Sequence, residues 1–161
     1  MIAIGWDTTR MAGEVQRTAT GALADDDSLA TAVLLSLFLD RQADADDALP
    51  DAGGALLAGS GALFARRGWI GDAIAMRDGE VAADRIGSRL WLLSRASQLP
   101  ETLRLAEDYA AEALAWLMTD GLATAVTVSA EWIARGTMAL TVQITLPAGE
   151  TEAYSYALRT A

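Results

Sequence analysis

The chain contains no cysteine, no histidine and no lysine. Without cysteine, disulfides and thiolate metal sites are excluded. Without histidine as well, the commonest general base and most transition-metal ligands are missing. The sequence also has no Gly-x-Ser-x-Gly elbow and no phosphate-binding loop, which would need a lysine. These absences predict a protein that is not an enzyme and that holds no cofactor and no metal.

Carboxylates are the chemistry that remains, with 22 acidic residues. Glycoside hydrolysis needs only two of them, so a glycan hydrolase stays open as an alternative although no motif marks a pair. From Asp40 to Asp51 there are five aspartates. They lack the ordered spacing and the terminal glutamate of a calcium loop. We therefore interpret this stretch as a solvated acidic loop.

The net charge of −10 argues against nucleic acid and against anionic membranes as partners. The longest apolar run, Val33 to Leu39, is interrupted by Ser36 and is far too short to cross a bilayer. The first residues, Met1 to Asp7, lack the basic start and long apolar run of a signal peptide. We expect a protein that stays in the cytoplasm where it is made or leaves it inside an assembly.

The length of 161 residues predicts one domain, residues 1–161, of the α+β class. We expect short N-terminal strands at Ile2–Trp6 and Gly13–Thr20, forming a hairpin. A helix from Leu29 to Arg41 should follow, capped by Asp27 or Ser28. Its apolar residues cover more than half of its circumference, which favours burial in the chain's own core over packing against a partner. Residues 42–66 are interpreted as an insertion loop.

Two further helices are expected, which gives three main helices. The first runs from Asp84 to Gln98, with Ile86, Leu90 and Leu93 on one buried face. Gly87 within it suggests a close approach by another backbone, because glycine is costly inside a helix. The second runs from Pro100 to Asp120 and ends at Gly121.

The last forty residues change to a period of two, which predicts a C-terminal three-stranded antiparallel meander. Tyr154, Tyr156 and Leu158 alternate with smaller residues in its last strand. An exposed edge there would be a template for strand addition by another chain. It could equally be a plain edge strand that Arg159 keeps soluble, and the pattern alone does not separate these readings.

Two stretches carry a family resemblance. One is Gly68-Trp69-Ile70-Gly71-Asp72 together with Arg85-Ile86-Gly87-Ser88-Arg89-Leu90-Trp91-Leu92-Leu93, and the other is Thr31 to Arg41. They resemble the small baseplate wedge protein of Mu-like contractile-tailed phages. That protein belongs to the sheath-initiator family, which also serves contractile bacteriocins and type VI secretion baseplates. The chain departs from the family pattern in its Gly/Ala/Leu-rich insertion after Pro50 and at Ile70, where another tryptophan is expected.

The resemblance implies a structural subunit of the tail baseplate in the virion, assembled in the host cytoplasm. It implies binding to a larger baseplate wedge protein, to the first sheath subunits, and to the tail tube or spike hub, in a ring of about six copies. A glycan hydrolase of the tail tip and an unrelated protein-binding module are the alternatives.

We expect two contact surfaces on the chain. Arginine and tryptophan are common at interface hot spots, so a docking patch for the larger wedge protein is predicted around the two motif segments. Arg85 and Arg89 share one face of the expected helix, an arrangement that is less costly if something anionic lies opposite; two ordinary solvated arginines are the simpler interpretation. The residues assigned to the patch are Trp69, Asp72, Arg85, Gly87, Ser88, Arg89, Leu90 and Trp91. Those assigned to the edge strand are Tyr154, Tyr156, Leu158 and Arg159.

Overall fold

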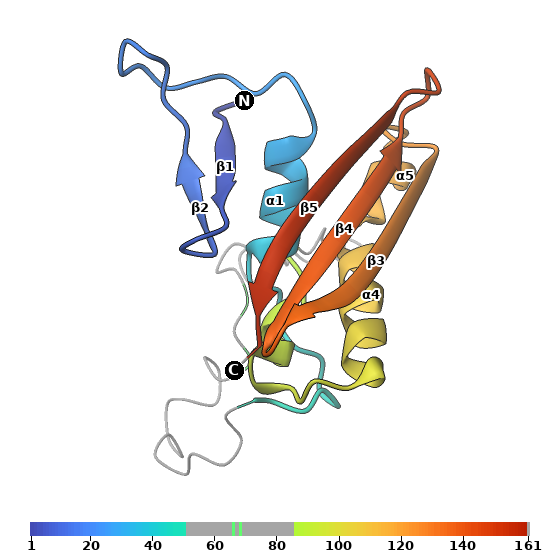
Figure 1. The fold of residues 1–161 in the computed structure, drawn as a ribbon. Helices are drawn as coiled ribbons and strands as arrows, with labels where there is room; N and C mark the ends of the chain where they lie inside the picture. Colours follow the sequence, from blue (N-terminus) through green and yellow to red (C-terminus); the bar gives the residue numbers. More distant parts are fainter. Residues whose placement is uncertain (51–65, 67, 69–85, 161) are drawn as a thin grey trace, which may run out of the picture.

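A computed structural model describes residues 1–50, 66, 68 and 86–160. A three-stranded sheet lies against the helices α1 and α4, and a small two-stranded hairpin stands beside α1 (Figure 1). This arrangement confirms the α+β class. In the described part of the chain, every helix is too short or too polar to cross a membrane.

The N-terminal hairpin pairs β1, Ile4–Asp7, with β2, Ala12–Val15, in antiparallel register. Both strands are shorter than predicted. The carboxylate of Asp7 begins the turn by accepting the amides of Thr9 and Arg10, at 2.8 and 3.2 Å. The backbone hydrogen bond from Arg10 has the largest effect, followed by that from Thr9, and both lower the pKa of the Asp7 carboxyl. The amide of Ile4 donates to the hydroxyl of Thr31, which ties the hairpin to α1.

Helix α1 spans Ala30–Phe38, and its residues Val33, Leu34 and Leu37 are buried in the chain's own core. The prediction that Asp27 or Ser28 is the cap residue is wrong, because the N-cap is Leu29. The carboxylate of Asp26 organises the helix start instead. It accepts the amide of Thr31 at 2.7 Å and both the amide and the hydroxyl of Ser28. The hydroxyl of Ser28 in turn accepts the amide of Ala30.

The expected helix from Asp84 to Gln98 is largely wrong among the described residues. Only Leu90–Arg95 is helical there, and it forms the 3₁₀ helix η2. Gly87 has a φ of 96°, which no right-handed helix permits. Ser88 forms a short parallel bridge with Asp40, through backbone hydrogen bonds with Leu39 and Arg41. Leu90 and Leu93 are buried as predicted, whereas Ile86 is 40% exposed.

The second expected helix is divided in two at Ala115, into α4, Pro100–Leu114, and α5, Trp116–Thr119. Proline occupies the first turn, where its missing amide costs nothing. Gly121, with a φ of 73°, follows the end of α5 as predicted. The core side of α4 and α5 is formed by four buried residues, Ala106, Ala110, Leu114 and Leu117.

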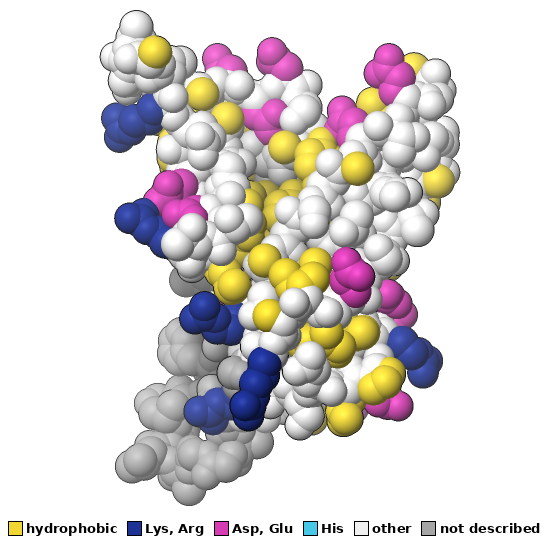
Figure 2. Space-filling view, in the orientation of Figure 1, with side chains coloured by type: hydrophobic (Ala, Val, Ile, Leu, Met, Phe, Trp, Pro, Cys, Tyr) yellow, Lys and Arg dark blue, Asp and Glu magenta, His cyan; other side chains and the backbone are white. Residues whose placement is uncertain are grey.

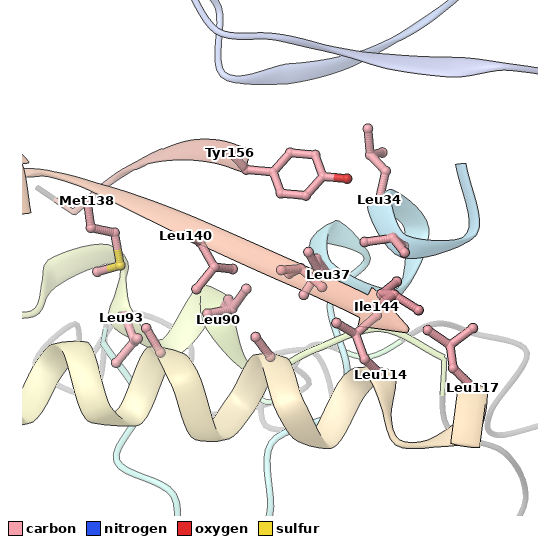
Figure 3. Close-up of a cluster of buried hydrophobic side chains, with 14 of the residues drawn as sticks. Leu34, Leu37, Leu90, Leu93, Leu114, Leu117, Met138, Leu140, Ile144 and Tyr156 are labelled. Atoms are coloured by element: carbon pink, nitrogen blue, oxygen red, sulfur yellow. The ribbon is translucent and has the colours of Figure 1, made fainter. Parts of the chain in front are cut away.

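The C-terminal meander is confirmed. It consists of β3, Ala125–Ala134, β4, Thr137–Thr145, and β5, Thr151–Arg159, in that spatial order. The even-numbered residues of β4 face the helices and are nearly inaccessible; they are Met138, Leu140, Val142 and Ile144. Figure 3 shows Met138, Leu140 and Ile144 meeting side chains of α1, η2 and α4 between the layers, and Val142 belongs to the same cluster. The other face of the sheet carries mostly threonine, serine and alanine.

Candidate interaction surfaces

Gly87 and Ser88 fix the start of the predicted docking patch to the end of α1. The amide of Ser88 donates to the carbonyl of Leu39 at 2.9 Å, and its carbonyl accepts the amide of Arg41 at 3.0 Å. The buried hydroxyl of Ser88 donates to the carbonyl of Leu37 at 2.5 Å. A Cβ on Gly87 would overlap the carbonyl of Leu39. The predicted close approach of another backbone at Gly87 is therefore confirmed, and that backbone belongs to the same chain.

Arg89 lies in an ion-pair cluster inside the described structure. Its guanidinium contacts Asp44 at 3.0 Å, Asp47 at 3.1 Å and Glu112 at 3.0 Å. It also lies over the ring of Tyr109, 4.7 Å from the centroid. Burial opposes the charge on Arg89, but the hydrogen bonds with Asp47 and Glu112 outweigh it and raise its pKa. The anionic groups expected opposite the arginines are therefore, for Arg89, groups of the chain itself.

The same cluster holds the acidic loop in place. Arg41 contacts the other oxygen of Glu112 at 3.2 Å, so one carboxylate joins α4 to both arginines. The guanidinium of Arg66 donates to the backbone carbonyls of Asp44 and Ala45. Asp44, Asp47 and Glu112 were missed as structural partners, and the part of the loop from 40 to 50 is less solvated than predicted. The signal in the sequence was the excess of aspartate close to a cluster of arginines.

The remaining patch residues are divided between the core and the undescribed part of the chain. Leu90 is buried in the core. Trp91 is half-buried, and its indole N–H donates to the carbonyl of Arg41 at 2.8 Å. Trp69, Asp72 and Arg85 lie outside the described residues. A contact with another chain stays a prediction for all of these positions.

Strand β5 carries its larger side chains on the core face. Tyr156 is 5% exposed and meets Phe38 and Trp6 edge to face, with centroids 5.3 and 6.0 Å apart. Trp6 and Phe38 are themselves stacked at 4.0 Å. Burial raises the pKa of Tyr156 to about 12. Tyr154, half-buried, donates its hydroxyl to Glu152, and Leu158 packs against the core beside Tyr156.

The backbone of β5 alternates between a paired side and an open side. The amide of Thr160 donates to Gly136, and the amide of Leu146 donates to Glu150, in continuation of the β4–β5 register. Because antiparallel pairing alternates, the even-numbered residues of β5 bond to β4. The odd-numbered residues direct their N–H and C=O groups away from the sheet; they are Thr151, Ala153, Ser155, Ala157 and Arg159. None of these outward groups has a hydrogen-bond partner among the described residues.

The other edge of the sheet, β3, differs at one position. Strand β3 packs against α4. The outward amide of Ala130 donates to the carboxylate of Glu107 on that helix at 2.9 Å. One outward amide of β3 is thus paired with a side chain of the helix, whereas no outward group of β5 is paired among the described residues; that side of β5 faces the hairpin (Figure 1).

Comparison with known proteins identifies the family. Residues 29–151 match the family described as phage protein GP46. The chain is 42% identical to baseplate protein gp46 of Escherichia phage Mu over 155 residues, which cover 96% of this chain and 93% of the relative. The chain belongs to the phage GP46 family.

A second member of the GP46 family supports the assignment. The chain is 38% identical to the Mu-like prophage FluMu protein gp46 of Haemophilus influenzae over 133 residues, which cover 83% of this chain and 79% of the relative. The resemblance to Mu-like phages is therefore confirmed. The chain is a structural baseplate protein of the Mu-like type, which places it in the tail of the virion and favours a non-enzymatic role.

Proposed function

We propose that this baseplate protein is the small wedge subunit that initiates the sheath. It binds the larger wedge protein around the tail tube or spike hub, in a ring of about six copies, and offers β5 to the first sheath subunit. The chain acts as one wedge domain, assembled in the host cytoplasm, with residues 42–66 as an insertion. The observation that carries the proposal is the open edge of β5.

Strand addition at β5 uses backbone chemistry that the fold leaves available. Five consecutive odd-numbered residues present N–H and C=O groups along one line, which is the pattern that an incoming strand needs. Natural sheets usually block such an edge with charge, proline or a covering element. In β5 the residues that direct their backbone outward are small and uncharged up to Arg159 at its end.

The contact with the larger wedge protein is proposed at the exposed part of Trp91, with Trp69, Asp72 and Arg85 as further contact residues predicted from the sequence. Arg89, Gly87 and Ser88 act in this proposal as supports, because their polar groups hold the segment rigid. Trp91→Ala should weaken binding to the larger wedge protein in a pull-down, whereas Arg104→Ala, an exposed arginine of α4, should not.

Proline at position 155 tests the strand addition. The amide of Ser155 points outward, so Ser155→Pro removes one group of the open edge without removing a bond to β4. Ser155→Ala is the matched control, because it removes the same hydroxyl and keeps the amide. We expect Ser155→Pro to reduce sheath seeding at least about tenfold, as followed by electron microscopy of sheath growth on purified baseplates. Normal seeding by a folded Ser155→Pro protein would refute strand addition at β5.

A further inference from the structure

A hollow of about 240 Å³ lies on the core side of the open edge. It is enclosed by the hairpin, the end of α1, η2 and the C-terminal part of β5. Its lining is mainly apolar and includes Trp6, Phe38, Met138 and Leu158. Figure 2 shows hydrophobic side chains along the depression between the hairpin and the sheet. The hollow thus borders the line along which an added strand would run.

The alternation of β5 determines which side chains of an added strand reach the hollow. Residues that face each other on neighbouring strands project their side chains to the same side of the sheet. A residue placed beside Tyr156 or Leu158 would therefore point toward the core face, where the hollow lies. Its two neighbours would point to the outer face, beside Ser155 and Ala157 or beside Ala157 and Arg159.

The lining favours an apolar occupant. The hydroxyl of Ser88 is already bonded to the carbonyl of Leu37, and the aromatic rings of Trp6 and Phe38 are stacked on each other. Asp40 and Arg159 supply the charged atoms of the lining, but most of the remaining lining residues are apolar, so a large apolar side chain gains more by leaving water than a charged one does. The volume corresponds to about eight water molecules in the liquid, which is enough for one large side chain.

We propose that the sheath strand that adds to β5 inserts one large aliphatic or aromatic side chain into this hollow. The proposal rests on the strand addition proposed above and defines its specificity. The backbone edge accepts many sequences, whereas the hollow selects a strand with a large apolar residue at the position beside Tyr156 or Leu158. Filling it would strengthen sheath binding about ten- to a hundredfold over an alanine at that position.

A pair of serine variants tests the hollow separately from the edge. Ser94 is exposed and lines the hollow, so Ser94→Phe places a ring at its mouth without altering the core. Ser97→Phe is the matched control, because Ser97 is also exposed, lies three residues further along and does not line the hollow. We expect Ser94→Phe to weaken binding of the purified sheath subunit at least about tenfold, and Ser97→Phe to leave it unchanged, by biolayer interferometry on folded proteins.

A photo-crosslinking residue at position 94 identifies the occupant. The expected product, detected by mass spectrometry, joins position 94 to a large apolar residue within an extended segment of the sheath subunit.

The two variants separate the two proposals. If Ser155→Pro blocks binding while Ser94→Phe binds normally, strand addition stands and the insertion is wrong. If Ser155→Pro binds normally, the strand addition itself fails. A crosslink between two copies of this chain, with a dimer in sedimentation that Ser94→Phe abolishes, would overturn the proposal in favour of self-association.

Discussion

The segment Gly87–Trp91 and the strand β5 differ in where their polar groups find partners. The first was predicted as a docking patch because arginine and tryptophan are common at interfaces. Its backbone and its Arg89 side chain are satisfied by α1, the acidic loop and α4. The second presents outward groups with no partner among the described residues. Whether polar groups already have hydrogen-bond partners therefore distinguishes a segment that supports the fold from a surface that is open to another chain. The types of residue in a segment do not make this distinction.

The largest expected effect lies in the satisfied segment. Gly87→Ala should lower the free energy of unfolding by more than about 3 kcal/mol, because the new Cβ overlaps the Leu39 carbonyl and the positive φ is strained. Gly21→Ala is the control, since Gly21 also has a positive φ but has no atom within 4 Å of a new Cβ. It should lose only about 1–2 kcal/mol. Equal losses in urea denaturation would show that the close approach contributes nothing.

Proline substitutions compare the open edge with the centre of the same sheet. Gln143 in β4 is exposed like Ser155, and it faces Thr127 of β3 and Ala153 of β5. The outward amide of Ala130 shows that odd-numbered residues of β3 and β4 bond to each other. Gln143→Pro should therefore lose a ladder bond and about 3 kcal/mol, whereas Ser155→Pro should lose less than about 1 kcal/mol. A similar loss for both variants would mean that the amide of Ser155 is already paired.

Arg89 should contribute more to the stability of the fold than to binding of the larger wedge protein. Arg89→Ala removes the guanidinium from Asp47 and leaves Glu112 paired with Arg41 alone, and it should cost about 2–3 kcal/mol in urea denaturation. Arg89→Lys keeps the charge but cannot reach both carboxylates with a planar fork, so it should recover only part of the loss. A fully stable Arg89→Ala protein that no longer binds the larger wedge protein would reverse this interpretation and return Arg89 to the docking patch.

The sequence predicted the elements with a clear period and missed those that depend on distant partners. The meander, the hairpin and the start of α4 follow from alternation, turn residues and Pro100, which act locally. The 3₁₀ helix was mistaken for a longer α-helix because the pairing of Ser88 with Leu39 and Arg41 spans about fifty residues of sequence. The ion-pair partners of Arg89 were missed for the same reason, since they are also distant in sequence. The excess of aspartate in the acidic loop was the one hint of them. Whether the edge of β5 is open to another strand depends on where the hairpin lies, and no local sequence pattern predicts that position.

The smallest expected effect separates stability from assembly. The hydrogen bonds from Ser28 and Thr31 hold the pKa of Asp26 well below its ordinary value of 3.8. A lowered pKa in the folded state stabilises the protein above about pH 4, and this contribution is lost as the pH falls toward the folded pKa. Asp26→Asn should therefore cost about 1 kcal/mol at pH 7 and progressively less below pH 4, in urea titrations from pH 7 to pH 3. Asp27→Asn, at an exposed neighbour, should cost nothing measurable.

Because Asp26 lies on neither the open edge nor the hollow, Asp26→Asn should bind the sheath subunit normally. Weaker binding would mean that the effect of Ser155→Pro also reflects general loss of stability.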